Sequence, residues 1–340
     1  MNIHVRPSAC CLVAAAWLSG LVSPASAWNG LGHRLISRAA ALRLPSEVPE
    51  FVRSADAISE IERLGPEPDR VKGTKSSADA DENPGHFVDV ADDGIIAGVV
   101  ALQSLPASRE AFDTALRAAG TNEYRIGFLP YSLIDGWYRL RRDFALWRVD
   151  VVGERKAASP EDRAWFTADR ILRESLTIRD IGVWSHYVGD ASQPLHTSVH
   201  YNGWGPLPNP KGYSTAKTLH ERFEGAFVRR HVTLDVVLSE MAPYEACNCP
   251  PERSITTTLV ASHALVIPLY ELEKADAFEQ GSPEAKRFVI SRLAAGASAL
   301  RNLVVDAWHA SATDSVGYPA ISVADVESEK LVPTRAMLEP

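Results

Sequence analysis

Cysteine is scarce in this chain, and its scarcity argues against a small domain held together by a network of disulfides. The 340 residues contain four cysteines, of which Cys10 and Cys11 lie in an apolar stretch near the N-terminus. The remaining pair, Cys247 and Cys249, is compatible with one local disulfide or with two free thiols. The fold must therefore depend on a hydrophobic core, on bound metal, or on both.

An excess of basic residues is also absent. The chain has 35 Lys and Arg against 43 Asp and Glu, a formal net charge of −8, and it would carry −9 without Arg6 of the N-terminal segment. Proteins that coat duplex nucleic acid neutralise phosphates with Lys and Arg, so this composition argues against that class. An acidic protein that acts on phosphates needs another source of positive charge, and bound metal would supply it.

Long apolar runs are missing too. The mostly apolar stretch from Cys10 to Val22 is shorter than the roughly 18 residues that a membrane span needs. Arg6 precedes it and Ala25-Ser26-Ala27 follows it with the small-x-small form of a cleavage site. We therefore predict a signal peptide over residues 1–27, cleavage before Trp28, and an exported protein, periplasmic or secreted, without a transmembrane segment. An uncleaved membrane anchor is the alternative.

Helical periodicity is abundant, whereas alternating strand patterns of useful length are nearly absent. Apolar residues recur at steps of three and four in five segments: 109–119, 130–147, 160–187, 256–278 and 283–312. No change of composition marks a second domain. We predict an all-α fold with one multi-helix domain over residues 28–315 and long loops, followed by an extended, mobile tail over residues 316–340.

Two long polar loops lead into residues that can carry chemistry. One loop, "GPEPDRVKGTKSSADADENPGH", ends at His86, and the other, "YNGWGPLPNPKGYSTAK", ends just before "TLHERFE". Loops above about 12–15 residues are uncommon in compact domains and are usually functional or disordered.

The segment "HYVGDASQPLH" places His186 and Asp190 four residues apart at the end of a helical pattern, on one face of the helix. Pro194 ends the helix, and the chain then turns to present His196. In "LHERFE", His220 and Glu224 repeat the same spacing. Imidazole nitrogen and carboxylate oxygen are ligands that zinc accepts.

Each pair alone is compatible with an ordinary surface salt bridge. However, five of the ten histidines lie beside carboxylates, turn residues or the predicted new N-terminus. These five are His33, His86, His186, His196 and His220. Their combined placement favours a metal site, whereas we expect His200, His231, His263 and His309 to pack in the interior or face water.

Four motifs occur in order between residue 28 and about residue 227: "WNGLGH", "HFVDV", "HYVGDASQPLH" and "LHERFE". In these motifs the chain resembles the superfamily of zinc-dependent single-strand-specific nucleases and bacterial zinc-dependent phospholipases C. The C-terminal third matches only in its helical character. The resemblance implies an all-α domain around a cleft with three zinc ions. It also implies three ligand sets: the α-amino nitrogen and carbonyl oxygen of Trp28 with His33 and the bridging Asp190; His86 and His186 with Asp190 and an upstream aspartate; and His196, His220 and Glu224.

The upstream aspartate is the least certain member of these sets. Asp69 is our choice for this ligand, with Asp56, Asp79 and Asp81 as alternatives. In the mechanism that the resemblance implies, a hydroxide on zinc attacks the phosphorus atom, and Asp69 has the catalytic role of orienting it.

The substrate class is open between the two branches of the superfamily. Phe87 and Asp89 resemble residues that hold a nucleobase in the nucleases, although a packed aromatic ring and a supporting hydrogen bond are the alternative. The short spacing from Trp28 to His33 also favours the nucleases. Glu224 and the apolar loop from Trp204 to Leu207 favour the phospholipases, and the paired cysteines that nucleases carry after "HFVDV" are absent.

We therefore expect a secreted zinc-dependent phosphodiester hydrolase, foremost an endonuclease or 3′-nucleotidase for single-stranded DNA or RNA. A phospholipase C that binds a phospholipid head group is the alternative, and a non-catalytic periplasmic zinc-binding helical protein is a further one. No stable protein partner is implied.

Overall fold

The computed structural model describes residues 28–205 and 207–339. The predicted signal peptide, residues 1–27, lies outside these residues. Almost all regular structure in the described part is helical, which confirms the all-α prediction. The longer helices are α1 (Gly30–Leu42), α3 (Ala55–Leu64), α5 (Arg109–Ala118), α7 (Leu129–Lys156), α8 (Pro160–Ala191), α12 (Pro251–His263), α13 (Val266–Lys274) and α15 (Pro283–Ser311).

Short elements connect these helices. The short α-helices are α2 (Glu50–Arg53), α4 (Ser77–Glu82), α6 (Glu123–Ile126), α9 (Leu219–Glu221), α10 (Phe227–His231), α11 (Leu234–Glu240), α14 (Ala277–Gln280), α16 (Val323–Glu327) and α17 (Arg335–Leu338). The 3₁₀ turns are η1 (Glu67–Arg70), η2 (Asn83–His86), η3 (Leu102–Ser104) and η4 (Pro194–Thr197), and η5 (Arg222–Ala226) is a turn of π-helix. Two small antiparallel hairpins pair β1 (Ile95–Ile96) with β2 (Val100–Ala101) and β3 (Ser315–Val316) with β4 (Ile321–Ser322).

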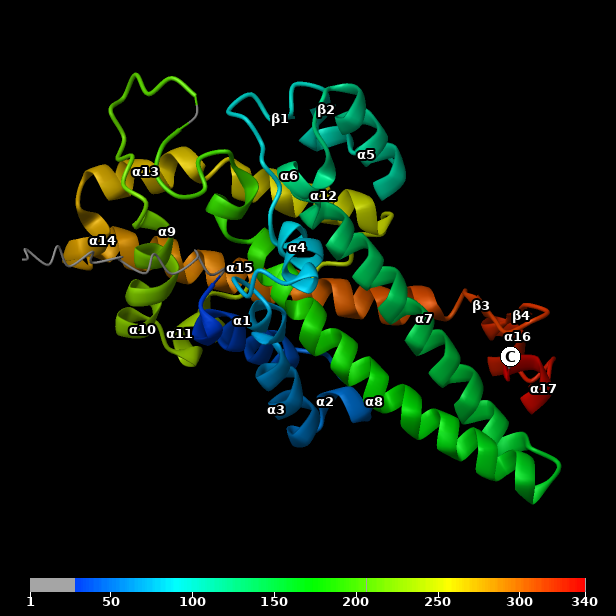
Figure 1. The fold of residues 1–340 in the computed structure, drawn as a ribbon. Coiled ribbons are helices and arrows are strands. Elements are labelled where there is room, and N and C mark those ends of the chain that lie inside the picture. Colours follow the sequence, from blue (N-terminus) through cyan, green and yellow to red (C-terminus); the bar gives the residue numbers. More distant parts are fainter. Residues whose placement is uncertain (1–27, 206, 340) are drawn as a thin grey trace, which may run out of the picture.

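Helices α7 and α8 form a long antiparallel pair, and α15 passes across it (Figure 1). Glycine on α7 permits this close packing, because a Cβ atom at Gly136 would collide with the ring of Trp184 and one at Gly153 with Phe166. Ser159 caps the start of α8 by accepting a hydrogen bond from the Asp162 amide. The α8 helix thus reaches the centre of the molecule with its C-terminal turn in a fixed place.

Two of the predicted helical segments differ from the structure. The segment 256–278 is not one helix, because it bends between α12 and α13 at Ala264 and Leu265 and again before α14. The sequence carries a helix breaker for the first bend, because Pro268 has no N–H to bond the carbonyl of Ala264 and its ring would clash with that carbonyl in a continuous helix. The α7 helix also extends well beyond its predicted end at residue 147.

The segment after Ser315 forms a hairpin and two short helices, so it is not extended as predicted, and its mobility stays a prediction. Val316, Ile321, Val323 and Val326 are buried against Ala145, Val149 and Val152 of α7 and form a second small core. These four apolar side chains thus cover an apolar stripe on α7. Cys247 and Cys249, whose state the sequence left open, are joined by a disulfide.

Two described stretches are long and apolar enough to cross a membrane by length and composition, Pro251–Lys274 and Pro283–Ser311. The first bends between α12 and α13, and the second is α15 itself. In α15, 61% of the apolar window is buried inside the protein, as is typical of a core helix.

Candidate metal centre

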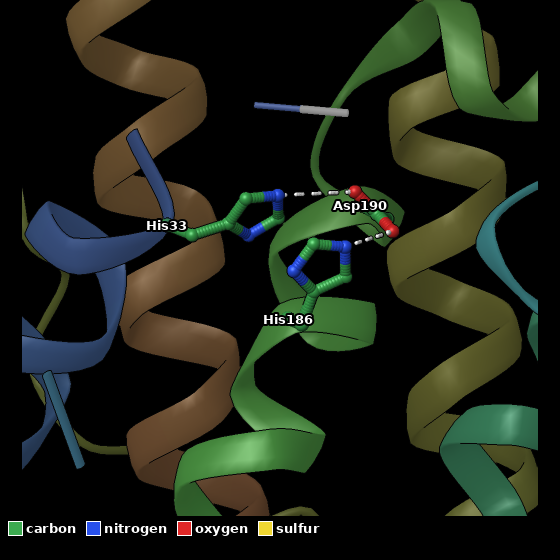
Figure 2. A group of neighbouring side chains, drawn as sticks. All are labelled: His33, His186 and Asp190. Atoms are coloured by element: carbon green, nitrogen blue, oxygen red, sulfur yellow. Dashed lines mark ion pairs between the residues drawn. The ribbon is translucent and has the colours of Figure 1, made fainter. Parts of the chain in front are cut away.

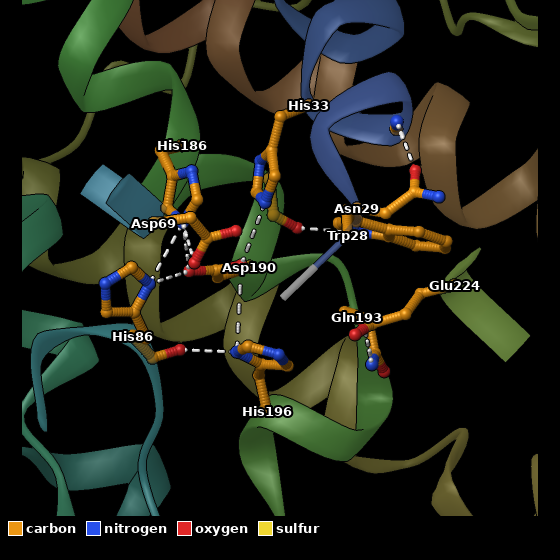
Figure 3. A network of polar contacts seen from close by, with 12 residues as sticks. Trp28, Asn29, His33, Asp69, His86, His186, Asp190, Gln193, His196 and Glu224 are labelled. Atoms are coloured by element: carbon orange, nitrogen blue, oxygen red, sulfur yellow. Dashed lines mark hydrogen bonds and ion pairs between the residues drawn. The ribbon is translucent and has the colours of Figure 1, made fainter. Parts of the chain in front are cut away.

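Three groups of His, Asp and Glu side chains converge at the C-terminal end of α8, with the ligand atoms of each group within 4.8 Å of one another. The three groups are His33, His186 and Asp190; Asp69, His86 and His186; and His196, His220 and Glu224. The second and third groups have the members that the resemblance implied, whereas in the first group His186 stands with His33 and Asp190 where the resemblance implied Trp28. Figure 3 shows most of these side chains close together.

The first set joins α1 to α8 (Figure 2). Nε2 of His33 lies 3.6 Å from Oδ1 of Asp190, and Nε2 of His186 lies 3.4 Å from Oδ2 of the same carboxylate. The rings of His33 and His186 are stacked, with centroids 3.6 Å apart. This approach depends on Gly189, since a Cβ atom there would lie 3.1 Å from Nδ1 of His33. Asp190 therefore faces two imidazoles from two helices.

Trp28 is completely buried beside this first set. Its indole nitrogen donates to the carbonyl oxygen of Gly189 at 3.0 Å, directly before Asp190. The next residue, Asn29, caps α1 by accepting hydrogen bonds from the amides of Leu31 and Gly32. The indole thus has an anchoring role that the sequence did not reveal. The predicted role of the Trp28 α-amino group as a ligand stays a prediction.

The second set shares His186 with the first. Nε2 of His186 lies 3.0 Å from Nδ1 of His86 and 3.6 Å from Oδ1 of Asp69, while Nδ1 of His86 lies 3.0 Å from Oδ2 of Asp190. Asp69 also forms an ion pair with Lys72, at 3.0 Å.

Among the four candidate upstream aspartates, the structure places Asp69 with the histidines. Asp56 and Asp81 are exposed, and Asp79 accepts a hydrogen bond from the amide of Lys75 instead. The sequence could not distinguish them, because the turn that presents Asp69 lies in a long loop without periodicity.

The third set combines η4 with the α9–η5 segment. Nε2 of His196 lies 3.1 Å from Nε2 of His220, which in turn lies 3.0 Å from Oε1 of Glu224. The predicted four-residue spacing brings His220 and Glu224 together, although the turn at Glu224 is π-helical rather than α-helical. Single π-helical turns are frequent at functional sites. Burial raises the pKa of Glu224, while His220 and Gln193 oppose that shift.

Three of the imidazoles are fixed by backbone carbonyls. Nδ1 of His186 lies 2.8 Å from the carbonyl oxygen of Gly65, and Nδ1 of His196 lies 2.6 Å from that of His86. Nδ1 of His220 lies 2.7 Å from the carbonyl oxygen of Tyr201. A carbonyl oxygen only accepts, so Nδ1 carries the proton in each ring and the Nε2 lone pair faces the cluster. This arrangement is typical of histidines that bind metal.

Burial makes four of the site histidines poor bases. It lowers the pKa of His33, His86 and His196 well below the usual value and that of His186 to about 4, since an imidazolium ion would be poorly solvated there. Burial also raises the pKa of Asp190 well above its usual value. The imidazoles are therefore neutral at neutral pH, with lone pairs free to coordinate.

Several polar atoms of the first set have no hydrogen-bond partner among the residues that the structure describes. Both ring nitrogens of His33 and Oδ1 of Asp190 are buried without one. Buried polar groups are almost always paired, so an unpaired group calls for an explanation such as an ion. A divalent cation would satisfy one ring nitrogen of His33 and Oδ1 of Asp190 and would compensate the buried carboxylates. The donor set therefore fits zinc.

A cavity of about 260 Å³ adjoins the second and third sets. Its walls are formed by Lys72, Asn83, His86, Phe87, Asp89, Arg125, Leu195, His196, Tyr201 and His220. Phe87 and Asp89 thus line the cavity, and backbone hydrogen bonds hold their segment in place. The Asp89 amide donates to the Ile126 carbonyl, and the Phe87 carbonyl accepts from the Leu129 amide. Burial raises the pKa of Asp89 to about 7.

The loop after η4 does not present Trp204 at an apolar rim, as the sequence predicted. Trp204, predicted as part of an apolar rim, is buried, and its ring stacks on His200 with centroids 3.7 Å apart. Tyr213 and Tyr270 pack against it. His200 is completely buried, in accord with the expectation that it packs in the interior.

Two residues of the site were missed in the sequence. Lys72 lies three positions after Asp69, a spacing that allows an ion pair along one turn of helix. Gln193 stands inside the quoted motif "QPLH" and contacts Glu224. Only their nearness to candidate ligands could have identified them.

No protein-family model matches the chain, and none of the curated proteins matches it. Among solved structures, the chain is similar to alpha-toxin of Clostridium perfringens from an avian strain, with a TM-score of 0.41 and 13% identity over 86% of this chain and 68% of the toxin. It is also similar to alpha toxin from Clostridium absonum, with a TM-score of 0.40 and 12% identity over 83% of this chain and 66% of the toxin.

These two likenesses do not decide between the nuclease expectation and the phospholipase C alternative. Likenesses at these TM-scores carry no argument about substrate, so both substrate classes stay proposals.

Proposed function

We propose that this protein is a metal-dependent phosphodiester hydrolase with three zinc ions. The observation that carries the proposal is the convergence of three N/O donor sets at the C-terminal end of α8, two of them beside one cavity, with the Nε2 lone pairs of three histidines turned inward by backbone carbonyls. Trp28, His33 and Asp190 would hold one ion, and Asp69, His86, His186 and Asp190 a second. His196, His220 and Glu224 would hold the third.

Zinc supplies Lewis acidity and positive charge at such a centre. The chain contributes two further cations to the cavity wall, Lys72 and Arg125. In a recess with poorly solvated walls, these charges attract a phosphodiester even though the whole protein is acidic. Asp69 lies at the edge of the second set, and its carboxylate would orient an attacking water molecule by accepting a hydrogen bond from it.

For the substrate, we propose that Phe87 and Asp89 bind the group attached to the phosphate. With a pKa near 7, Asp89 can donate or accept a hydrogen bond around neutral pH. A nucleobase would stack on an aromatic ring and bond a carboxyl group, which supports the nuclease proposal. The phospholipase C alternative keeps the support of Glu224 but not of Trp204, because that ring is buried and offers no apolar rim.

A side-by-side assay would test the proposal. The protein beginning at Trp28, loaded with zinc, is incubated with single-stranded DNA, RNA and phosphatidylcholine vesicles, with and without a chelator. We expect chelator-sensitive cleavage of one substrate class, foremost single-stranded nucleic acid. Cleavage of phosphatidylcholine alone would establish the phospholipase C alternative. Three bound zinc ions without turnover on any substrate would contradict the hydrolase proposal and favour a non-catalytic zinc protein.

A further inference from the structure

Gln193 occupies the short connection between α8 and η4, where its side chain is completely buried. Its backbone is fixed at both ends, since its amide donates to the Asp190 carbonyl and its carbonyl accepts from the His196 amide, each at 3.0 Å. The residue therefore lies between a proposed ligand of the first two ions and one of the third.

The orientation of the Gln193 amide follows from its partners. Its Oε1 atom accepts a hydrogen bond from the backbone amide of Leu195 at 2.6 Å. An amide N–H can only donate, so the oxygen must be the end that faces Leu195. Nε2 then points into the third set, 3.0 Å from Oε2 of Glu224 and 3.3 Å from Nε2 of His220 (Figure 3).

Of the two atoms in front of this amide, Oε2 of Glu224 is its hydrogen-bond acceptor in the metal centre. Oε2 is the only Glu224 oxygen that forms a hydrogen bond among the described residues, and its donor is Gln193. His220 donates from Nδ1 to Tyr201, so its Nε2 atom is an acceptor. That single lone pair is the one a cation would take, so with metal bound Gln193 holds the Glu224 carboxylate and leaves Nε2 of His220 to the ion.

We propose that Gln193 is a positioning residue for the third metal ion. By binding Oε2 of Glu224, it leaves Oε1, which lies 3.0 Å from Nε2 of His220, directed at the cation. This inference rests on the proposed metal centre, but not on the identity of the substrate. Partners that orient metal ligands typically change metal affinity by about 10- to 100-fold when they are removed.

A purely structural role for Gln193 would use only its Oε1 atom. That atom caps the first turn of η4 through the Leu195 amide and needs no nitrogen on the side chain. The substitution Gln193→Glu separates the two roles, because a carboxylate still accepts the Leu195 hydrogen bond but cannot donate to Glu224. It also places a second carboxylate against Oε2 of Glu224.

Metal affinity is the decisive measurement, made by competition with a chromophoric zinc chelator on the protein beginning at Trp28. For Gln193→Glu, we expect one of three ions to bind about 10- to 100-fold more weakly, with the other two unchanged. Cobalt(II) substitution should change the absorption spectrum of that one site. Gln280→Glu, an exposed change of equal charge on α14, is the matched control and should bind all three ions as the original protein does.

Unchanged or tighter binding of the third ion by Gln193→Glu would overturn the inference. If that variant does not fold, Gln193→Met, which is similar in length and has no amide N–H, is measured in the same way with the same criteria. Failure of the original protein to bind metal would instead contradict the proposed function. The two failures are therefore distinguishable.

Discussion

His186 belongs to two of the three donor sets, and its Nε2 atom lies within 3.6 Å of His86, Asp69 and Asp190. In the proposed assignment His186 binds the second ion next to Asp190, which that ion shares with the first, so the substitution His186→Ala should weaken the binding of both ions. We expect bound zinc to fall from three equivalents to one or none and turnover to fall by more than about 100-fold. Elemental analysis and the substrate assay measure both.

The control for this prediction is a histidine outside the centre. His309 forms a half-exposed ion pair with Glu47. His309→Ala should retain three zinc ions and full turnover. Full zinc content in His186→Ala would contradict the assignment of the donor sets.

Trp28 is proposed to act through its backbone, and its indole has a separate anchoring role. An alanine added before Trp28 would convert the α-amino group into an amide, which binds zinc poorly, and leave the indole in place. We expect this extended protein to lose one zinc ion. Elemental analysis and chelator competition against the protein that begins at Trp28 measure the loss.

Trp28→Phe is the matched control, because it keeps the amine and removes the indole hydrogen bond to Gly189. It should keep three zinc ions and lose about 1 kcal/mol of the free energy of unfolding. Three tightly bound ions in the extended protein would refute the N-terminal ligand.

At the scale of elements, the sequence predicted contacts within one helix but not contacts between helices that are distant in the chain. The four-residue spacings of His186 with Asp190 and of His220 with Glu224 determine contacts within one turn, and both contacts are present. The stacking of His33 on His186 depends on how α1 packs on α8, which no local pattern specifies.

The tail after Ser315 is a second case. The sequence predicted an extended segment here, because the residues that its valines and Ile321 pack against lie on α7, more than 150 residues earlier, and no local pattern identifies them. The two prolines that start α8 and η4 were, by contrast, visible in the sequence, since proline acts through its own backbone.

The α7–α8 pair carries a buried carboxyl group whose ionisation should oppose folding. Asp150 is completely buried, and burial together with the charge of Asp169 raises its pKa to about 8. Between the usual pKa near 4 and about 8, the folded protein binds a proton that the unfolded chain has lost. Stability from this group is therefore present at low pH and is lost as the pH rises through that window.

Asp150→Asn places an uncharged side chain at this position at every pH. We expect it to raise the free energy of unfolding at pH 8–9 by about 1–3 kcal/mol and to change little at pH 4. Urea unfolding at both pH values measures this difference. Glu245→Gln, an exposed change of equal charge, is the control, and an equal gain in both variants would show that net charge rather than burial is responsible.

At the scale of the whole molecule, the net charge of −8 contrasts with a cavity bordered by Lys72, Arg125 and histidines of the second and third donor sets. Composition predicted this contrast correctly in one respect: the acidic chain offers a phosphodiester few cations of its own. Composition could not predict where the two cavity cations lie, because their positions depend on the long loop before His86 and on α6.

The donor sets also connect parts of the chain that are distant in sequence. Their members come from α1, η1, η2, α8, η4 and the α9–η5 segment, so three bound ions would cross-link six elements. An ion that binds only the folded state stabilises it by about 2.7 kcal/mol at one hundred times its dissociation constant. Removal of the ions would also leave His33 and Asp190 buried with unpaired polar atoms.

We therefore expect a chelator to lower the thermal midpoint of unfolding by about 10 °C or more, and added zinc to restore it. Calorimetry of the protein beginning at Trp28 measures the shift, with His186→Ala as a comparison that should respond less because it starts with fewer ions. A midpoint insensitive to the chelator, in a protein shown to release three zinc ions, would mean that the hydrophobic core alone holds these six elements in place. The ions would then serve the reaction and not the fold.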